Sequence, residues 1–279
     1  MVEDTLARSG SPLSRPVVSA ATGPVVVVTG ATSGIGLAVA RQLRATGARV
    51  VGTGRDQGRL QDLASTVDLA LTLDVTDQRS VDMVQAAVLD RYGHVDAVVN
   101  NAGIGHFAPW PDTTIDAFER VLDVDLLGCV RVAQAFLPAM VEAGTGCLVN
   151  IASVAGLRGY PKHTAYCAAK HGLIGWSRAL HKDLQGTGVA VVVVCPPAVD
   201  TPFFERAGYF TWKQDHPGFQ PMSADAVASG VVRALQRRPR QVVLSRRAQL
   251  LYAVDTVAPG LIDGLQAWKN RRWAASGNP

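Results

Sequence analysis

Tyr166 and Lys170 stand four residues apart in a stretch typical of a helix. Positions i and i+4 share one face of a helix, so the Lys170 ammonium is expected beside the Tyr166 phenol, where it favours the phenolate. Ser153 precedes Tyr166 at the end of an apolar, strand-like run. A phenol tuned in this way gives a proton to a carbonyl oxygen, or takes one back, near neutral pH. The alternative is ordinary packing, because tyrosine–lysine pairs are common on amphipathic helices.

A glycine cluster near the N-terminus gives this pair a context. Gly30, Gly34 and Gly36 follow a buried, valine-rich run and open a helical segment. Residues without side chains allow a tight turn and let backbone amides approach a pyrophosphate, whose charge a helix N-terminus also favours. The glycine cluster, Ser153 and the Tyr166–Lys170 pair together favour the catalytic interpretation and predict a nicotinamide-dependent oxidoreductase.

The elements that must position these residues alternate along the chain. Valine-rich runs at 24–29, 49–53, 69–73, 95–99, 147–152, 189–195 and 241–244 are predicted strands. Segments with helical period fall near 35–46, 57–65, 78–91, 114–143, 164–186 and 223–237. Continuous apolarity in the strands indicates burial on both faces. The sequence therefore predicts a single-domain α/β, doubly wound (Rossmann) fold, with a parallel seven-stranded sheet and helices on both faces.

The chain length and composition suit one core. With 279 residues, 48% of them hydrophobic, the chain needs no second domain. Residues 24–245 are the predicted catalytic domain, after a flexible extension at 1–23. An aromatic-rich stretch at 201–222 is interpreted as a mobile flap, or equally as a segment packed permanently on the core. Residues 246–279 are predicted to be an amphipathic tail that packs on the domain, caps the substrate pocket or contacts an anionic membrane surface.

Composition also argues against several classes of protein. The net charge of +4 is mild, and no basic stripe with interleaved aromatics predicts nucleic-acid binding. Four cysteines without metal-ligand spacing (Cys129, Cys147, Cys167 and Cys195) are expected to be buried thiols, so no metal is predicted. We see no signal peptide and no run of about eighteen apolar residues for a membrane span, and we expect a cytoplasmic protein.

The ordered motifs resemble those of the short-chain dehydrogenase/reductases, from about residue 24 to 202. The resemblance implies that Ser153, Tyr166 and Lys170 are catalytic and that Lys170 also binds the nicotinamide ribose. It implies that Asp74 holds the adenine ring and that Asn101 stabilises the central strand beside the coenzyme. The full set of coenzyme-binding residues that it implies is Gly30, Thr32, Ser33, Gly34, Ile35, Gly36, Arg55, Asp74, Val75, Asn101, Ala102, Gly103, Tyr166, Lys170, Pro196, Val199 and Thr201.

The end of the second predicted strand bears on the choice of coenzyme. A carboxylate there accepts from the ribose 2′-hydroxyl of NAD and repels a 2′-phosphate. Here Gly54 and Arg55 occupy that place, and a guanidinium suits the extra phosphate. Asp56 lies near the spacing of an NAD-selecting acid but follows the strand end. The sequence therefore predicts NADP(H).

Two residues depart from the family pattern. The resemblance leads one to expect asparagine at position 125, in the proton path to the lysine, and glycine at position 197. The chain has Asp125 and Pro197. A carboxylate accepts from water or an ammonium but cannot donate as an amide does, and it raises the pKa of a nearby lysine. We include Asp125 in the predicted catalytic set, with an altered relay.

The predicted reaction is the NADP(H)-dependent interconversion of a carbonyl and an alcohol on a hydrophobic substrate. Rival interpretations are a coenzyme-binding regulatory protein with weak or no catalysis, and a sugar-nucleotide epimerase, for which the chain is short. The resemblance also implies a homodimer or homotetramer that associates through the helices near 114–143 and 164–186. The candidate residues of the substrate wall are Ile104, Phe107, Trp110, Leu157, Tyr160, Phe203, Phe204, Tyr209 and Phe210.

Overall fold

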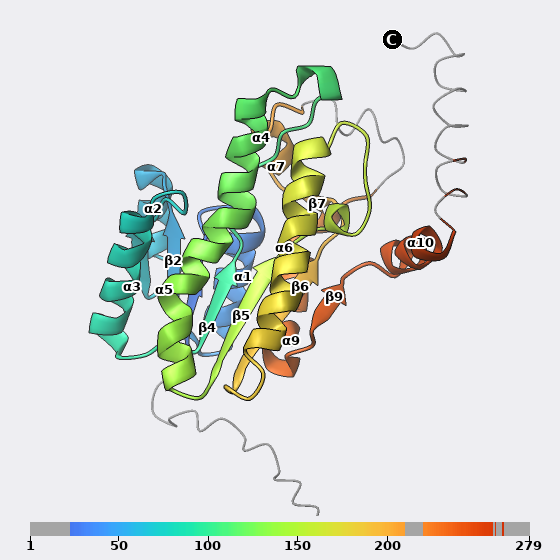
Figure 1. The fold of residues 1–279 in the computed structure, drawn as a ribbon. Coiled ribbons are helices and arrows are strands. Elements are labelled where there is room, and N and C mark those ends of the chain that lie inside the picture. The colour runs from blue at the N-terminus through green and yellow to red at the C-terminus, as the bar shows by residue number, and fades with distance from the viewer. Residues whose placement is uncertain (1–22, 210–219, 259, 261–263, 265–279) are drawn as a thin grey trace, which may run out of the picture.

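The computed structural model describes residues 23–209, 220–258, 260 and 264 of the chain. Seven parallel strands form one sheet in the order β3-β2-β1-β4-β5-β6-β9 (Figure 1). The strands of this sheet are β1 (Val25–Val28), β2 (Arg49–Gly54), β3 (Leu69–Thr72), β4 (Ala97–Asn100), β5 (Gly146–Ile151), β6 (Val189–Cys195) and β9 (Gln241–Val243). A separate parallel pair joins β7 (Val199–Asp200) to β8 (Met222–Ser223). The predicted α/β fold with seven parallel strands is confirmed.

Helices cover both faces of the sheet. The helices are α1 (Gly34–Ala45), α2 (Gln57–Ala64), α3 (Gln78–Tyr92), α4 (Ile115–Leu122), α5 (Gly128–Glu142), α6 (Thr164–Asp183), α7 (Phe203–Arg206), α9 (Ala224–Arg237) and α10 (Arg246–Val257), with short turns η1 (Trp110–Asp112), η2 (Asp123–Leu127) and η3 (Val154–Gly156). Side chains of α1, α2 and α9 pack on one face, and those of α3, α5 and α6 on the other.

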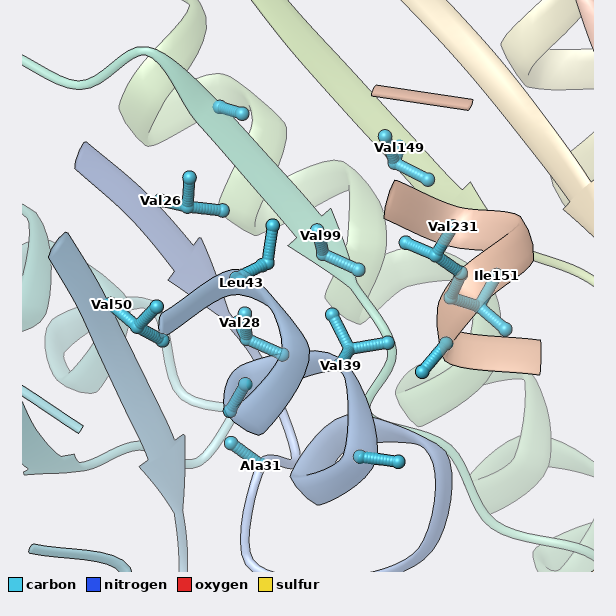
Figure 2. Close-up of a cluster of buried hydrophobic side chains, with 14 of the residues drawn as sticks. Val26, Val28, Ala31, Val39, Leu43, Val50, Val99, Val149, Ile151 and Val231 are labelled. Carbon is cyan, nitrogen blue, oxygen red and sulfur yellow. The ribbon is translucent and has the colours of Figure 1, made fainter. Parts of the chain in front are cut away.

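Strand β1 shows why the apolar runs are continuous. Val26 and Val28 point into the core under α1, and Val25 and Val27 point into the core on the opposite face. Figure 2 shows the first of these cores, where Val26 lies near Leu43 of α1 and Val28 near Val39. Because neighbouring side chains of a strand alternate between faces, burial on both faces requires every residue to be apolar.

The strand order reverses at the centre of the sheet. The chain runs outward from β1 through β2 to β3, then returns to place β4 on the other side of β1. In such sheets a crevice opens at the carboxyl ends of the central strands, where the connections diverge. The glycine loop follows β1, and Asn101 follows β4, so both lie at this crevice.

The long helix predicted at 114–143 contains a π-helical turn. α4 ends at Leu122, η2 (Asp123–Leu127) has π-helical hydrogen bonding, and α5 then continues. A β-carbon on Gly128 would lie 2.7 Å from the Val75 side chain, so only glycine allows this close approach to the end of β3. A π-turn inserts one residue and re-aims its side chains. The periodicity of the sequence did not predict this π-helical turn.

Helix ends elsewhere agree with the sequence. Ser223 caps α9 by accepting a hydrogen bond from the Ala226 amide at 3.2 Å. Gly47, Gly186 and Gly188 have positive φ and follow the ends of α1 and α6, where glycine commonly ends a helix. The four cysteines are buried free thiols, as predicted.

The predicted flap at 201–222 is described only at its two ends. Its first part forms the short helix α7, with Tyr209 buried, and its last residues form β8. Residues 210–219, which include Phe210, Trp212 and Pro217, lie outside the described part of the chain. The predicted flexible extension at 1–23 likewise lies outside it, except for residue 23.

The tail at 246–279 is described mainly by α10, which projects from the domain in Figure 1. None of its side chains is buried, and those of Leu250 and Val257 are 66% and 86% exposed. The apolar run from Leu250 to Val254 passes around the whole helix and gives no separate apolar face. Along α10 the amphipathic prediction is therefore wrong. Most of the tail beyond Val257 lies outside the described residues.

The segment Ile115–Glu142 is long and apolar enough to cross a membrane by length and composition alone. Core helices of many proteins pass the same test, and here Val132, Phe136 and Met140 pack against the sheet. Asp125 and Arg131 also interrupt its apolar sequence. We therefore treat this segment as a core helix.

Candidate coenzyme and catalytic site

An ion pair lies at the centre of the candidate site. The Nζ atom of Lys170 is 3.0 Å from Oδ2 of Asp125, and the two side chains are 5% and 0% exposed. Lys170 also donates to the Ile151 carbonyl oxygen at 3.2 Å, and the Ile104 amide donates to Oδ1 of Asp125 at 2.7 Å. The π-turn η2 presents Asp125 to Lys170 of α6. The tertiary structure thus brings together the two residues that the resemblance placed in one proton path.

The charge state of each residue in the pair depends on its surroundings, because both side chains are buried. Burial lowers the pKa of Lys170, but Asp125, Tyr166 and Cys129 together raise that pKa above its usual value. Burial raises the pKa of Asp125, and Lys170 opposes this effect. The short contact and the amide of Ile104 favour an ammonium facing a carboxylate. The charge of Lys170 is therefore largely compensated within the protein.

This compensation changes the expectation for Tyr166. Burial raises the pKa of its phenol, the Lys170 ammonium and a hydrogen bond with Ser153 lower it, and Asp125 raises it again. The net shift is upward, so the prediction that Lys170 brings Tyr166 within reach of neutral pH is wrong for the protein alone. The main cause is the burial of the phenol away from water, and the Asp125 carboxylate adds to it.

Ser153 lies where β5 delivers it. It directly follows Ala152 at the carboxyl end of the strand, and its hydroxyl accepts from the Ala155 amide at 3.1 Å as the cap of η3. The same hydroxyl interacts with the Tyr166 phenol. The hydroxyls of two predicted catalytic residues are therefore adjacent, although η3 was not predicted.

A buried polar network that we did not predict supports the site from behind. The Asn100 amide donates to the Asn150 side chain at 2.9 Å, and Asn150 donates to the Ser177 hydroxyl at 2.8 Å. Ser177 in turn donates to the Leu173 carbonyl oxygen at 2.6 Å. This network ties β4, β5 and α6 together. The available signal was the two asparagines inside otherwise apolar strands.

The loop after β4 is joined to the glycine loop by hydrogen bonds. The Thr29 hydroxyl accepts from the amides of Asn101 and Ala102, each at 3.0 Å. The side-chain amide of Asn101 donates to the carbonyl oxygens of Thr29 and Gly30. Asn101 therefore fixes the glycine loop against the central strand, as the resemblance implied.

The glycine loop has the geometry of a phosphate cradle. Gly30 and Gly34 have φ of +64° and +54°, and a β-carbon on Gly36 would lie 2.4 Å from the Gly30 carbonyl oxygen. Ser33 precedes α1, but its side chain does not cap the helix. The side chains before α2, α3, α4, α9 and α10 do cap their helices. The residues present thus fit a dinucleotide whose phosphates accept from the N-terminus of α1.

The far end of the crevice is lined by exposed charges. Arg55 directly follows β2 and lies 3.8 Å from Oδ2 of Asp74. Burial raises the pKa of Asp74, but hydrogen bonds from Thr76 and the charge of Arg55 lower it more, so the pKa lies below its usual value. Asp56 accepts from the Arg59 amide at 3.0 Å as the cap of α2. Asp56 thus caps α2, whereas Arg55 faces the carboxylate of Asp74, which is predicted to bind adenine.

The other predicted coenzyme residues also lie at the carboxyl ends of the strands. Val75 follows β3, and Gly103 leaves space beside Asp125, since its β-carbon would lie 3.1 Å from Oδ2. The Pro196 carbonyl oxygen accepts from the Val154 amide at 3.0 Å. Thr201 contacts Gly34, where an added β-carbon would lie 3.1 Å from Cγ2. Also at this edge are Thr32 and Ile35 of the glycine loop, Ala102 after β4 and Val199 in β7.

Aromatic side chains gather around Tyr166. The ring of Phe107 lies 5.6 Å from that of Tyr166, and Phe203 lies 5.7 Å from Tyr166. Phe107 also contacts Phe204 at 5.4 Å and His163 at 4.5 Å between ring centroids. His163, which stands three residues before Tyr166, was not among the predicted site residues.

Not every predicted wall residue joins this group. Tyr209 lies 5.8 Å from Phe107, and Ile104 packs with Tyr166. Tyr160 lies 6.1 Å from the His163 ring, while Leu157 packs near Leu173. Trp110 is 78% exposed and does not join the wall.

Among the described residues, no three His, Cys, Asp or Glu side chains gather as metal ligands would. The chemistry available at this site comes from the phenol, hydroxyl, ammonium and carboxylate groups described above.

Comparisons with known proteins agree with this geometry. The family model for short chain dehydrogenases matches residues 24–209. A ketoacyl reductase, HetN, from Nostoc is 30% identical, over 88% of this chain and 89% of its own. Actinorhodin polyketide ketoreductase with NADPH is 32% identical, with a TM-score of 0.72 over 79% of this chain and 95% of its own. A Burkholderia phymatum short chain dehydrogenase/reductase with NAD is 25% identical, with a TM-score of 0.77 over 86% of this chain and 95% of its own.

The fold and the crevice define a nucleotide-binding α/β oxidoreductase. The chain belongs to the short-chain dehydrogenase/reductase family, whose members use nicotinamide coenzymes and act on alcohol and carbonyl groups.

Proposed function

We propose that this protein is an NADP(H)-dependent reductase or dehydrogenase that interconverts a carbonyl and an alcohol on a hydrophobic substrate. The observation that carries the proposal is the convergence of Ser153, Tyr166 and the Lys170–Asp125 pair beside the glycine loop. These groups come from three distant parts of the sequence and meet at the crevice where ligands bind in this class of fold.

In the proposed reaction, Ser153 and Tyr166 hold the substrate oxygen. The Tyr166 hydroxyl gives its proton to that oxygen during reduction and takes a proton from the alcohol during oxidation. Lys170 stabilises the phenolate that remains, and Asp125 holds the ammonium in place while moderating its charge. The coenzyme, when bound, supplies or accepts the hydride at the substrate carbon.

The chain's residues fit NADP(H) at the exposed end of the crevice. Arg55 stands beside Asp74, where adenosine is proposed to bind, and its guanidinium can pair with a 2′-phosphate. Asp56 is engaged with the amide and the guanidinium of Arg59. Similar structures contain both NADPH and NAD, so the proposal rests on Arg55.

The aromatic side chains around Tyr166 support an apolar substrate. Phe107 and Phe203 contact the Tyr166 ring, Phe204 contacts Phe107, and these rings offer little to a charged group. The ketoreductases among the similar proteins support a ketone as the first substrate to try.

The direct test is coenzyme oxidation by the purified protein with aliphatic and aromatic ketones, aldehydes and acyl thioesters. NADPH and NADH are compared at equal concentration. We expect turnover of at least one apolar carbonyl with a higher kcat/KM for NADPH. A higher kcat/KM for NADH contradicts the coenzyme assignment.

One observation favours a second candidate, a coenzyme-binding regulatory protein. Asp125 compensates the charge of Lys170, and the pKa of Tyr166 is raised instead of lowered. Tight binding of NADPH, with no oxidation of any carbonyl offered, would support this candidate over the enzyme.

We also propose that the chain forms a homodimer or homotetramer through α4, α5 and α6. Large apolar side chains on this part of the surface are exposed, with Ile115 at 70%, Leu127 at 46% and Val141 at 38%. Light scattering tests this, and a monomer at micromolar concentration contradicts it.

We retain 24–245 as the proposed catalytic unit, with 246–279 as an appendage that contacts a neighbouring subunit or a lipid surface.

A further inference from the structure

Arg206 connects two distant segments at the mouth of the crevice. It is the last residue of α7 and donates from Nη1 to the Ser33 hydroxyl at 2.8 Å. Ser33 precedes α1 in the glycine loop, 173 residues earlier in the chain. The guanidinium therefore lies beside the loop that is proposed to cradle the coenzyme phosphates.

The charges around Arg206 place it toward the adenosine end of this loop. Burial lowers the pKa of Arg206 below its usual value, Arg59 lowers it further, and Asp56 raises it. Asp56 and Arg59 belong to the start of α2, immediately after Arg55. Among the described residues, Arg206 forms no ion pair with a carboxylate. Asp56 and Asp74 are instead engaged with Arg59 and Arg55.

We propose that Arg206 is a second ligand of the coenzyme 2′-phosphate, provided from α7 in addition to Arg55. This inference rests on the proposed use of NADP(H). Two guanidiniums, one from α7 and one from the end of β2, can clasp a dianionic phosphate, and a guanidinium matches phosphate oxygens better than an ammonium does. The bound phosphate would take the place of the Ser33 hydroxyl as acceptor and would reduce the repulsion between Arg206 and Arg59.

The same residue couples the coenzyme to the substrate pocket. α7 carries Phe203 and Phe204, which contact Phe107 at 5.9 and 5.4 Å between ring centroids. Phe203 and Phe107 in turn contact Tyr166. A phosphate held by Arg206 therefore fixes the helix whose aromatic side chains form the wall beside the proposed proton donor. NADPH is expected to lower the substrate KM more than NADH does.

The test is equilibrium binding of NADPH, NADH and 2′,5′-ADP by titration calorimetry to the full-length protein. The variants are Arg206→Ala, Arg206→Lys, Arg55→Ala and the matched control Arg237→Ala. Arg237 is an exposed arginine in the last turn of α9, just before β9 begins, and so lies at the opposite edge of the sheet. Circular dichroism melts confirm that each variant is folded.

We expect Arg206→Ala to weaken NADPH and 2′,5′-ADP about tenfold and NADH less than twofold. Arg206→Lys should recover part of the affinity, because it keeps the charge without the forked geometry. Arg237→Ala should bind like the wild type.

Equal weakening of NADPH and NADH by Arg206→Ala, or no weakening of either, overturns the assignment of Arg206. One outcome overturns only this inference: the wild type prefers NADPH, Arg55→Ala loses that preference, and Arg206→Ala keeps it. If the wild type binds both coenzymes equally and Arg55→Ala changes nothing, the proposed coenzyme choice fails together with it.

Discussion

The two ends of the crevice handle charge in opposite ways. At the buried end, Lys170 and Asp125 lie 3.0 Å apart and are almost inaccessible to water. At the open end, Arg55 and Asp74 lie 3.8 Å apart with side chains 63% and 40% exposed. Water and salt screen the second pair, whereas the first pair interacts strongly and depends on its partner for compensation.

This difference predicts which substitutions destabilise the folded protein and which do not. Removing one charge at the buried end leaves the other without compensation in a site that water does not reach. Removing one charge at the open end exposes the other to solvent at little cost in stability. We therefore expect buried substitutions to affect folding and chemistry, and exposed substitutions to affect mainly the choice of coenzyme.

The largest effect is expected from Lys170→Met, which keeps the apolar stem but leaves Asp125 unpaired. We expect the free energy of unfolding to fall by about 3–5 kcal/mol, measured by urea denaturation at neutral pH. The pKa of Asp125 is already raised above 3.8 by burial, and losing Lys170 raises it further. The destabilisation should therefore shrink as the pH falls toward 3.8 and grow as it rises.

The control for Lys170→Met is Lys182→Met, which removes an exposed charge from the last turn of the same helix. It should leave the unfolding free energy nearly unchanged. Equal, small effects of the two substitutions would contradict the compensated buried pair.

Tyr166→Phe tests the chemistry at the buried end without removing a charge. The proposed proton donor is lost while the ring and its packing remain, so turnover should fall about 100-fold or more. Coenzyme affinity, measured by calorimetry, should stay within about twofold because the glycine loop is unchanged. Tyr92→Phe, on α3, is the matched control, and near-normal turnover by Tyr166→Phe would refute its role.

Arg55→Ala tests the open end. It should weaken NADPH about tenfold relative to NADH, with no measurable change in the unfolding free energy, because its side chain is largely exposed. Gly54→Asp is a less clean test, since its β-carbon would lie 2.5 Å from Cγ2 of Thr32. A parallel loss of NADH affinity in Arg55→Ala would show that the two ends are not independent.

Asp125→Asn gives the smallest expected change in rate and the most informative change in pH dependence. The Asp125 charge raises the pKa of Tyr166, so the neutral amide should lower it. Alcohol oxidation needs the phenolate, and its rate therefore rises with pH through this pKa. In Asp125→Asn that rise should move to lower pH, with maximal turnover changed by a few-fold.

The matched control for Asp125→Asn is Asp123→Asn, in the same π-turn, where the carboxylate pairs with Arg131 at 2.7 Å instead of with Lys170. It should leave the pH profile in place. If the two variants have the same profile, Asp125 does not act on Tyr166 through its charge.

Local patterns in the sequence predicted the fold and most of the crevice. The valine-rich strands, the glycines of positive φ and the spacing of Tyr166 and Lys170 depend on neighbouring residues and on the periods of strands and helices. Connections between parallel strands then place every βα loop at one edge of the sheet. For this reason the residues after β1, β2, β3 and β4 meet as expected.

The sequence alone determined the strands and helices of the main sheet and the residues of the glycine loop and the Tyr166–Lys170 pair. Only the tertiary structure decided the electrostatics of the site and the neighbours of α7. The π-turn that presents Asp125, the exclusion of water that raises the pKa of Tyr166, and the contact of Arg206 with Ser33 all depend on segments far apart in the chain. Burial and charge compensation are properties of the packed molecule, and no local pattern of residues encodes them.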